Sequence, residues 1–477
     1  MAKISKIYQK VNDEFLEIPI DEIMSKLSSL ESGKLNKTDA SSTYLSKTDA
    51  TSTYLNKTDA GNTYAKKTDL TAYLTTSSAS TTYLSKTDAT STYLSKNDAS
   101  STYSTIVYVK DELRAKIEAV SGGRNTVVYD TFGYPHIMVV IPVFNLQDID
   151  SSLGTGVHPA FIVNGVRKSE ILIGKYIASK GSDGKAKTLP HKFPWVNINF
   201  DTSLAECRKL GSNFGLCSQA ITSARALYLW KHFGEHEYLG NTYWGRSHSK
   251  TYQTGTMGLV SFAPGDTGNN DNNVGASTAT GSGPDDWNDD GTPYGISDLV
   301  GNVWEWRSGL RINNGEIQVI ENDNALLATA DMSATSSQWK AISGTNGTLV
   351  APGTAGTLKY NAPKAGGTTN TNVGAPSLCT TITNNTGNTA YSLSHMKDFK
   401  ADSGVTVPAI AKILGLYPMA TDTSVQGGIW MRNSGERLPF CGGDWHNGAS
   451  CGPFALALSY TRTNAHRYLG FRVAFYS

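Results

Sequence analysis

The sequence predicts an α+β head that follows an N-terminal fibrous shaft of decapeptide repeats. A ten-residue unit recurs almost literally from Leu35 to Tyr103, which is the signature of a repeat architecture. All nine tryptophans lie beyond Arg124, where short apolar runs such as residues 137–141 alternate with Gly- and Asn-rich stretches. The 477 residues are therefore divided between a fibrous part and a compact part with a hydrophobic core.

The first segment, residues 1–34, is predicted to contain a helix from about Asp21 to about Gly33. Spacings of three and four positions place four apolar residues on one helical face: Ile20, Ile23, Leu27 and Leu30. An apolar stripe this narrow needs a partner to cover it. We therefore expect residues 1–34 to attach the chain to another protein.

Residues 35–104 form the predicted shaft, in which LSKTDATSTY is a typical unit. Each unit offers only a Leu, an Ala and a Tyr for burial, whereas ordering costs about 1–2 kcal/mol per residue. One unit cannot fold alone, so the units must stack or associate with neighbouring chains. The repeated Leu and Tyr positions favour an oligomeric fibre, and the alternative is a disordered Ser/Thr-rich linker.

Residues 105–123 are predicted to form a helical neck between shaft and head. Leu113, Ile117 and Val120 share one helical face, and Gly122-Gly123 end the helix. We expect this apolar face to hold chains together beneath the head.

The head, residues 124–477, is predicted to contain short strands, long polar loops and a few helices. The predicted helices are Ser203–Leu210, capped by Asp201 or Thr202, then Gln219–Phe233, and a segment from Val405 to Leu416. Glycine- and threonine-rich runs after Gly309 indicate turns between further short strands.

Composition excludes several classes of protein. The formal charge is +1, from 42 Lys and Arg against 41 Asp and Glu, so no nucleic-acid partner is expected. Met1 is not followed by an apolar signal region, and no stretch approaches the roughly 18 apolar residues of a spanning helix, so no membrane insertion is expected. The five cysteines are widely spaced without a CxxC pair, which indicates buried thiols rather than a disulfide scaffold or a zinc cluster.

Two local patterns offer metal chemistry. Residues 232–236 read H-x-x-E-H, but Gly234 interrupts the helix, which favours surface histidines at a helix end over zinc catalysis. Residues 269–291 concentrate the Asp and Asn oxygens that calcium prefers, but without the EF-hand spacing, which favours a solvated loop. No nucleophile elbow or Walker loop is present, so an enzyme has little support.

A more specific block runs from Tyr294 to Trp306, YGISDLVGNVWEW. It closely resembles the G-L-x-D-M-x-G-N-V-W-E-W signature of formylglycine-generating-enzyme-like domains, which are elaborated C-type lectin folds. Residues 194–197, 442–445 and 470–472 resemble further elements of that family in the same order. The resemblance covers about residues 125–477, with an insertion at about 308–435, and implies a C-type lectin-like head.

The resemblance also bears on cofactors. In the family this motif lies near a calcium site, so Asn302 and Glu305 are candidate calcium ligands, whereas Trp304 and Trp306 are expected to pack in the core. The enzymes hold copper with a closely spaced cysteine pair beyond the G-G-S motif. Here only Cys451 follows that motif, and Cys441 precedes it. We therefore expect no enzymatic activity and no required cofactor, although a formylglycine-generating-enzyme-like oxidoreductase remains the alternative.

Residues 441–472 resemble, more narrowly, the variable region of diversity-generating-retroelement target proteins of phages and their hosts. The predicted scaffold residues in this stretch are Trp445, Phe454, Arg462, Phe471 and Arg472. The asparagines of the variable pattern fall on ten positions: Asp444, His446, Asn447, Ser450, Ala457, Ser459, Tyr460, His466, Arg467 and Tyr468. Mutagenesis of adenines in an Asn codon can yield every one of these residues.

Strand alternation suggests how such positions are tolerated. Phe454, Leu456 and Leu458 are predicted to face the core, leaving Ala455, Ala457 and Ser459 on a face that is free to vary. Tyrosine, histidine and arginine at variable positions are typical of adaptable binding sites, and an ordinary polar lectin surface is the alternative.

Together these features predict a phage tail-fibre receptor-binding protein. The repeats resemble those of phage tail fibres, which are commonly homotrimers, so the resemblance implies a homotrimer whose N-terminus binds a virion tail or baseplate protein. The head would bind a bacterial surface protein or glycan for host adsorption. The expected location is the virion, after synthesis in the bacterial host cytoplasm, and prophage-encoded cell-surface display and a purely structural fibre are alternatives.

Overall fold

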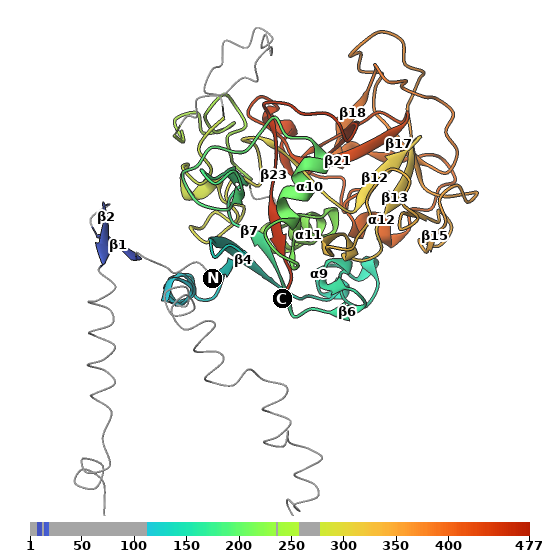
Figure 1. Cartoon of the computed structure of the whole chain (residues 1–477). Coiled ribbons are helices and arrows are strands. Elements are labelled where there is room, and N and C mark those ends of the chain that lie inside the picture. The colour runs from blue at the N-terminus through green and yellow to red at the C-terminus, as the bar shows by residue number, and fades with distance from the viewer. Residues whose placement is uncertain (1–6, 12–13, 19–111, 235–236, 257–276) are drawn as a thin grey trace, which may run out of the picture. The chain divides into compact units, whose positions relative to one another are not determined.

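The computed structural model describes residues 7–11, 14–18, 112–234, 237–256 and 277–477 (Figure 1). The chain divides into two compact units, Met1–Thr102 and Tyr103–Ser477. The predicted attachment helix of residues 21–33 and the repeats of residues 35–104 lie outside the described residues. Their conformation stays a prediction.

The described part of the first unit is one antiparallel hairpin. It pairs β1 (Ile7–Val11) with β2 (Glu14–Ile18), and Ile7 lies opposite Ile18. The hairpin precedes the segment for which a helix is predicted.

The described part of the second unit begins with the predicted neck helix. Residues 112–121 are helical, and Gly122 and Gly123 follow with φ of 62° and 79°, so the predicted helix and its glycine end are confirmed. Leu113 and Val120 are 38% and 72% exposed. Arg114 Nε donates a hydrogen bond to the carbonyl of Val127, which ties the helix to the first strand of the head.

A five-stranded antiparallel sheet forms one part of the head. Its order is β10-β24-β7-β4-β3, so the last strand of the chain lies between β10 and β7. The strands are β3 (Asn125–Tyr129), β4 (Pro135–Pro142), β7 (Glu170–Gly174), β10 (Phe214–Leu216) and β24 (Val473–Phe475). Two small hairpins flank β7 in the sequence. The first pairs β5 (Ile162–Val163) with β6 (Val166–Arg167), and the second pairs β8 (Ser179–Lys180) with β9 (Ala186–Lys187).

Most strands of the larger sheet come from the predicted insertion, residues 308–435. Within the described head it has thirteen strands, with β18-β20-β22-β21-β12-β13-β16-β17-β19 as its main path and β11, β14, β15 and β23 attached. Its strands are β11 (Trp304–Trp306), β12 (Leu310–Asn313), β13 (Glu316–Val319), β14 (Lys340–Ile342), β15 (Leu349–Val350), β16 (Lys359–Asn361), β17 (Ser377–Cys379), β18 (Ser392–His395), β19 (Lys400–Ala401), β20 (Gly428–Met431), β21 (Glu436–Gly442), β22 (Gly452–Tyr460) and β23 (Leu469–Phe471). Strands β12 to β20 all come from residues 308–435, so the insertion extends the sheet that bears the predicted variable region.

Four α-helices belong to the described head: α9 (Leu146–Ile149), α10 (Phe200–Arg208), α11 (Gln219–Phe233) and α12 (Ala409–Ile413). The prediction of α11 is confirmed, and Ser218 caps it by accepting a hydrogen bond from the Ile221 amide. The predicted caps of α10 are wrong: Asn199 accepts from the Thr202 amide, and the helix starts at Phe200. The predicted helix of residues 405–416 is confirmed only over the five residues of α12.

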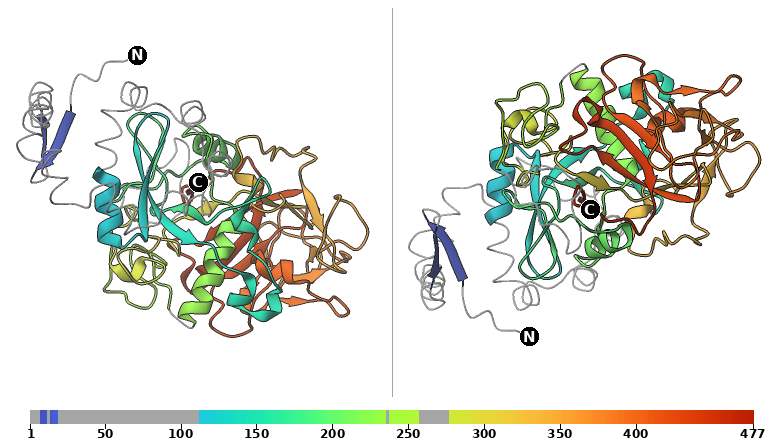
Figure 2. Two further views of the ribbon diagram at one scale, coloured as in Figure 1. Left: turned by 90° about the horizontal axis from the view of Figure 1, so that it is seen from below. Right: turned by 90° about the horizontal axis from the view of Figure 1, so that it is seen from above.

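The main core lies between α11 and the larger sheet. Helix α11 packs against β22, and both views of Figure 2 show this green helix beside the red C-terminal strands. Nine consecutive residues of the helix, Gln219–Leu227, are buried, and so is Leu229, which explains why its sequence is apolar on more than one face. The predicted mixture of short strands with few helices is confirmed.

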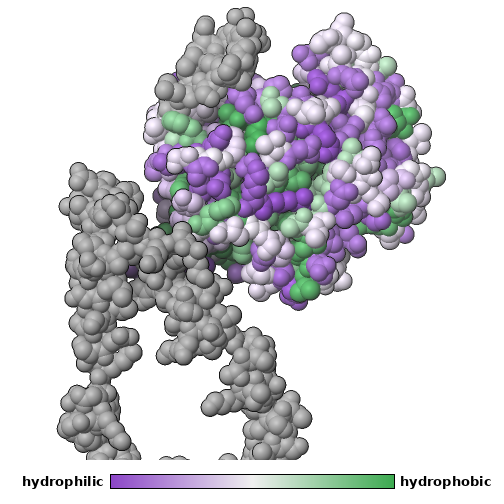
Figure 3. Space-filling model, viewed as in Figure 1, coloured by the Kyte–Doolittle hydropathy of each residue, from purple (hydrophilic) through white to green (hydrophobic). Residues whose placement is uncertain are grey.

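Among the described residues, no helix is long and apolar enough to cross a bilayer. On the face drawn in Figure 3, hydrophilic and hydrophobic residues are interspersed and no broad hydrophobic area gathers. This mixture agrees with the near-neutral formal charge of +1.

A buried carboxylate predicts a pH-dependent stability. Asp323 is fully buried, and within the described residues neither carboxylate oxygen makes a hydrogen bond of ordinary geometry. Burial raises the pKa of Asp323 well above its usual value, and the nearby Ser218 hydroxyl opposes this only in part. The folded state therefore holds a proton that the unfolded chain releases above about pH 4, so this residue destabilises the fold increasingly as the pH rises.

Asp323→Asn is therefore expected to raise the unfolding temperature at pH 8, by an amount that corresponds to about 1–3 kcal/mol, and to change it little at pH 4. Thermal unfolding of the full chain across this pH range measures the effect. The exposed Asp398→Asn serves as the matched control. Equal effects of Asp323→Asn at both pH values would contradict the expectation.

Candidate ligand-binding site

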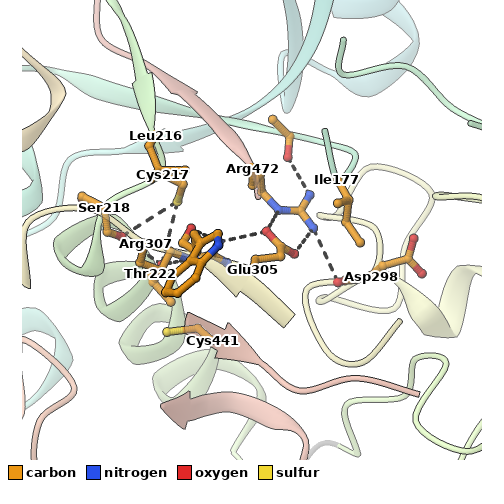
Figure 4. A network of polar contacts seen from close by, with 12 residues as sticks. Ile177, Leu216, Cys217, Ser218, Thr222, Asp298, Glu305, Arg307, Cys441 and Arg472 are labelled. Carbon is orange, nitrogen blue, oxygen red and sulfur yellow. Dashed lines mark hydrogen bonds and ion pairs between the residues drawn. The ribbon is translucent and has the colours of Figure 1, made fainter. Parts of the chain in front are cut away.

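A buried ionic network holds together the strands around the site (Figure 4). The Glu305 carboxylate on β11 accepts hydrogen bonds from Arg472 Nη2 and Nε at 2.7 and 2.9 Å, and from Arg307 Nη1 at 2.9 Å. Arg472 also donates to the carbonyls of Gly174 and Ser297. Burial alone would raise the pKa of Glu305, but the two guanidinium groups outweigh burial and lower it. The network fixes β11 against the C-terminal strands.

Strand β11 lies between β21 and β23. Glu305 pairs with Cys441 of β21 in antiparallel register and with Gly470 of β23 in parallel register. Strand β22 lies on the other side of β21. This order brings the start and the end of the predicted variable region, residues 441–472, to the same part of the sheet.

A pocket of about 160 Å³ opens where these strands meet. Seven of its ten lining residues belong to the ten predicted variable positions: Asp444, His446, Asn447, Ala457, Ser459, Tyr460 and Tyr468. The other three are aromatic residues of the framework, Trp304, Trp430 and Phe440. The structure therefore gathers positions that are spread over 25 residues of sequence into one concave site.

Aromatic rings form most of the pocket wall. Trp304 meets Trp430 and Phe440 edge to face, with ring centroids 5.2 and 5.1 Å apart. Tyr460 stacks on Phe440 at 4.8 Å, and its hydroxyl lies 2.5 Å from the hydroxyl of Tyr468. Burial raises the pKa of both tyrosines, so both hydroxyls are protonated at neutral pH. Rings that contact one another in this way form a rigid surface.

Asp444 provides the one carboxylate of the pocket lining. The turn before it needs Gly443, whose φ is 90° and where a side chain would collide with Cys451. The side chain of Asp444 is 1% exposed. Its Oδ1 atom accepts a hydrogen bond from the His446 amide at 3.1 Å and lies 2.8 Å from His446 Nδ1. Its Oδ2 atom is buried without a hydrogen-bond partner among the described residues.

The remaining three predicted variable residues lie outside the pocket lining. The His466 ring stacks in parallel on Tyr468 at 5.0 Å and lies 4.7 Å from the Tyr460 ring, so it extends the aromatic wall. Arg467 is half-buried beside Tyr468. Ser450 lies in a 3-10 turn, η6 (Gly448–Ser450), and is not part of this pocket.

One aspect of the surface prediction is wrong. Ala455 and Ala457, expected on a free face of β22, are each 1% exposed, because they pack in a cluster with Trp304, Trp306 and Phe440. The alternate residues Phe454, Leu456 and Leu458 belong to the core cluster that includes α11, so both faces of β22 are covered. Asp444 is also buried. Ala457 and Asp444 nevertheless line the pocket, so they belong to its depth and not to an open surface.

The predicted scaffold residues lie mainly in the core. Trp304, Trp306, Trp445, Phe454, Phe471 and Arg472 are all buried, which confirms the prediction that the two tryptophans of the W-E-W motif pack in the core. Arg462 is half-buried and binds Glu436 at 2.8 Å and Asp201 at 2.6 Å. Trp304 has a second role that the sequence does not indicate, because it also lines the pocket.

Sequence reasoning missed Trp430, Phe440 and Trp244. Trp430 lies on β20 within the insertion, and its pairing with Ala457 of β22 places it beside the variable strand. Trp244 stacks on the exposed His446 ring at 5.8 Å. Their only sequence signal is the presence of a large aromatic residue, which does not distinguish a pocket wall from a core.

The candidate calcium ligands have other partners. Asn302 Oδ1 accepts from the Thr278 amide, and its Nδ2 donates to the Thr278 carbonyl. Both oxygens of Glu305 bind arginines, as described above. In the described residues, no three His, Cys, Asp or Glu side chains gather in a way that could hold a metal ion. These contacts do not favour calcium at Asn302 and Glu305.

The other two sequence patterns that offered metal chemistry lie partly outside the described residues. Of residues 269–291, three of the described acids form ion pairs: Asp289 binds Arg225 at 2.6 Å, and Asp286 binds Lys250 at 2.6 Å. Asp290 binds Arg124. Two residues of the H-x-x-E-H motif, 235 and 236, lie outside the described residues. Helix α11 ends at Phe233, the second residue of the motif.

All five cysteines lie in the described head and are buried free thiols, as predicted. Burial raises the pKa of Cys451 well above its usual value, and the Asp444 carboxylate acts in the same direction. The Cys451 Sγ contacts the Asp444 carbonyl at 3.2 Å. Such a thiol is protonated and a poor nucleophile at neutral pH.

A second, larger pocket of about 400 Å³ is also lined by residues of the 444–451 loop. Its wall includes Gly448, Ala449 and Cys451 from this loop, together with His248 and His395 from other segments. None of the ten predicted variable residues lines it. We therefore take the smaller aromatic pocket as the candidate site.

Comparisons with known proteins give a structural likeness but no family. The chain matches no protein-family model and no curated protein. Among solved structures it is similar to "Treponema denticola variable protein 1", with 13% sequence identity over 74% of this chain and 99% of that chain. The TM-score is 0.28, which does not by itself establish a shared fold.

Proposed function

We propose that this chain is a receptor-binding protein of a phage tail fibre, and that the aromatic pocket of its head binds a bacterial surface protein or glycan. One observation carries the proposal. Seven positions that the sequence pattern marks as diversified line one pocket, although one strand, β22, and two separate loops supply them. An unselected set of polar and apolar positions would be spread between core and surface.

The pocket has the properties of a ligand-binding site whose residues can be diversified. Its framework residues, Trp304, Trp430 and Phe440, are held by mutual edge-to-face contacts and by the sheet. Its other residues can change without altering the strand pairing, because backbone hydrogen bonds and the Glu305 network hold the strands. In the proposal, the head is a C-type lectin-like domain and residues 441–472 are the target of a diversity-generating retroelement.

The proposal extends to assembly and location. The chain would form a homotrimer through the repeats and the neck, where Leu113 and Val120 are exposed on helix 112–121. Residues 1–34 would bind a virion tail or baseplate protein. Three heads on one stalk would raise the effective concentration of weak single contacts. The expected location is the virion, with no nucleic-acid partner and no membrane insertion.

The proposed activity is binding and not turnover. The oxidoreductase alternative requires two neighbouring reactive thiols, whereas Cys451 is buried, has a raised pKa and has no second cysteine after the G-G motif. A purely structural fibre has no need for a pocket lined by varied residues.

Competition for host cells tests the proposal. The purified full chain is expected to bind cells of the bacterium that the encoding phage infects, and to block adsorption of that phage as its concentration rises. Cells of a bacterium outside the phage's host range serve as the control. Absence of binding to host cells, or binding that leaves adsorption unchanged, would contradict a receptor-binding role.

A further inference from the structure

We propose that the aromatic pocket takes a primary ammonium group, and that its occupant is a lysine side chain of a surface protein. This inference rests on the proposed function, because it names the chemistry that the same pocket recognises. Three features of the pocket carry it: the charge of the lining, the arrangement of the rings, and the size of the cavity.

The charge of the lining favours a cation. Among the ten lining residues, Asp444 is the one acid and His446 the one histidine, and no Lys or Arg is present. Asp444 Oδ2 is buried and has no hydrogen-bond partner among the described residues. A buried oxygen without a hydrogen bond destabilises the folded protein, and a donor that enters the pocket and binds this oxygen would remove that cost. The contact would be a charge-assisted hydrogen bond, which is stronger than a neutral one.

The rings add a second attraction for the same charge. Five aromatic side chains line the pocket: Trp304, Trp430, Phe440, Tyr460 and Tyr468. A cation within about 6 Å of a ring centroid is attracted to the face of that ring, and Trp is the strongest partner. Neighbouring centroids of Trp304, Trp430 and Phe440 are 5.1–5.2 Å apart, so one group in the pocket meets more than one ring.

Size and hydrogen bonding select among cations. The cavity of about 160 Å³ lies below the roughly 300–1,000 Å³ of sites for drug-sized ligands, so it suits a single side chain or a small head group. A quaternary ammonium has no N–H group to donate to Asp444 Oδ2, whereas a lysine ammonium has three. The Ser459 hydroxyl in the lining offers a further acceptor. A guanidinium pairs most strongly with both oxygens of a carboxylate, whereas Asp444 Oδ1 is already engaged by His446.

The route to Asp444 passes the rim of the pocket. The His446 side chain is 38% exposed and lies between Trp244 and Tyr468. Because Asp444 is almost fully buried, the ammonium reaches Oδ2 when the His446 ring turns aside. Arg432, which directly follows β20, is not part of the pocket lining, and its guanidinium donates hydrogen bonds to the backbone carbonyls of Ala390 and Ser459.

The test compares small probes on the full chain by isothermal titration calorimetry or by NMR titration. The probes are Nα-acetyl-lysine methylamide, the uncharged norleucine analogue, the arginine analogue and choline. The lysine probe is expected to bind with a dissociation constant in the millimolar range and at least 10-fold more tightly than the norleucine analogue. Asp444→Asn, which preserves shape, is expected to abolish this preference, and Asp398→Asn, an exposed acid outside the pocket, is expected to preserve it.

Each contrary result has a distinct meaning. Equal binding of the lysine and norleucine probes, or an unchanged preference in Asp444→Asn, would overturn the ammonium site. Tighter binding of choline or of the arginine probe would overturn the assignment to lysine. Host-cell binding by the same preparation separates the two proposals: cells bound without a lysine preference would leave the proposed function in place and reject this inference.

Discussion

Glu305→Ala is expected to lower the free energy of unfolding of the head by about 3–5 kcal/mol, because it leaves two buried guanidinium groups without their shared anion. The side chains of Arg307 and Arg472 have no exposed surface, and that of Glu305 is 1% exposed. Arg472 would keep its backbone carbonyl acceptors, and Arg307 would keep the Thr222 hydroxyl, but neither acceptor carries a full negative charge. The loss should therefore exceed that of an ordinary hydrogen bond.

Urea unfolding, followed by the fluorescence of the tryptophans, measures this effect, since all nine lie in the head. The matched control is Glu112→Ala, which removes an exposed acid that binds Lys116 one helical turn away, and its expected cost is below about 0.5 kcal/mol. If Glu305→Ala cost no more than Glu112→Ala, the network would not be what holds β11 in place.

Replacing Tyr460, His466 and Tyr468 together by Ala is expected to reduce binding of the full chain to host cells by at least about 100-fold, since buried aromatic anchors at an interface often contribute about 2 kcal/mol or more each. The three rings contact one another, with centroids 4.7 and 5.0 Å apart for the two ring pairs that include His466. Truncation would remove one wall of the pocket and leave its framework of Trp304, Trp430 and Phe440. Fluorescently labelled chain, titrated onto host cells, gives the affinity.

A structural role must be separated from a binding role in this variant. Circular dichroism and the mass of the assembly are expected to stay unchanged, because backbone pairing holds the strands that carry these residues. Tyr134→Ala, at a tyrosine that is 45% exposed and not in the pocket lining, is the matched control and should bind cells normally. Normal cell binding by the triple variant would mean that the pocket is not the receptor site, and loss of folding would mean that the three rings belong to the core.

Local patterns in the sequence were sufficient for some elements and not for others. Helix α11 is confirmed over its full length because Ser218 and Gly234 mark its ends, whereas the start of α10 depends on Asn199, which no pattern distinguishes from Asp201 or Thr202 as a cap. The role of the insertion could not be predicted. Its strands are two to four residues long, and only pairing across the sheet, such as Trp430 with Ala457, gives them a position.

The candidate site shows the same division. The resemblance of residues 441–472 to a variable region supplied seven of the ten pocket residues, without any knowledge of the pocket. Alternation along β22 failed for Ala455 and Ala457, because this strand is covered on both faces and an alternating pattern indicates exposure only where one face meets water. The framework aromatics come from three separate strands, so their convergence is a property of the sheet order and not of any local sequence.

The DNA that adjoins the coding sequence offers the most direct test of the central claim, that the aromatic pocket is a diversified ligand site. Sequencing is expected to find a second copy of the stretch that encodes Cys441–Arg472, differing only at adenines, beside a reverse-transcriptase gene. The differing codons should include those of the seven pocket residues and spare those of Trp445, Phe454 and Phe471. Absence of such a copy, or differences that fall on the buried scaffold and not on the pocket, would contradict the account.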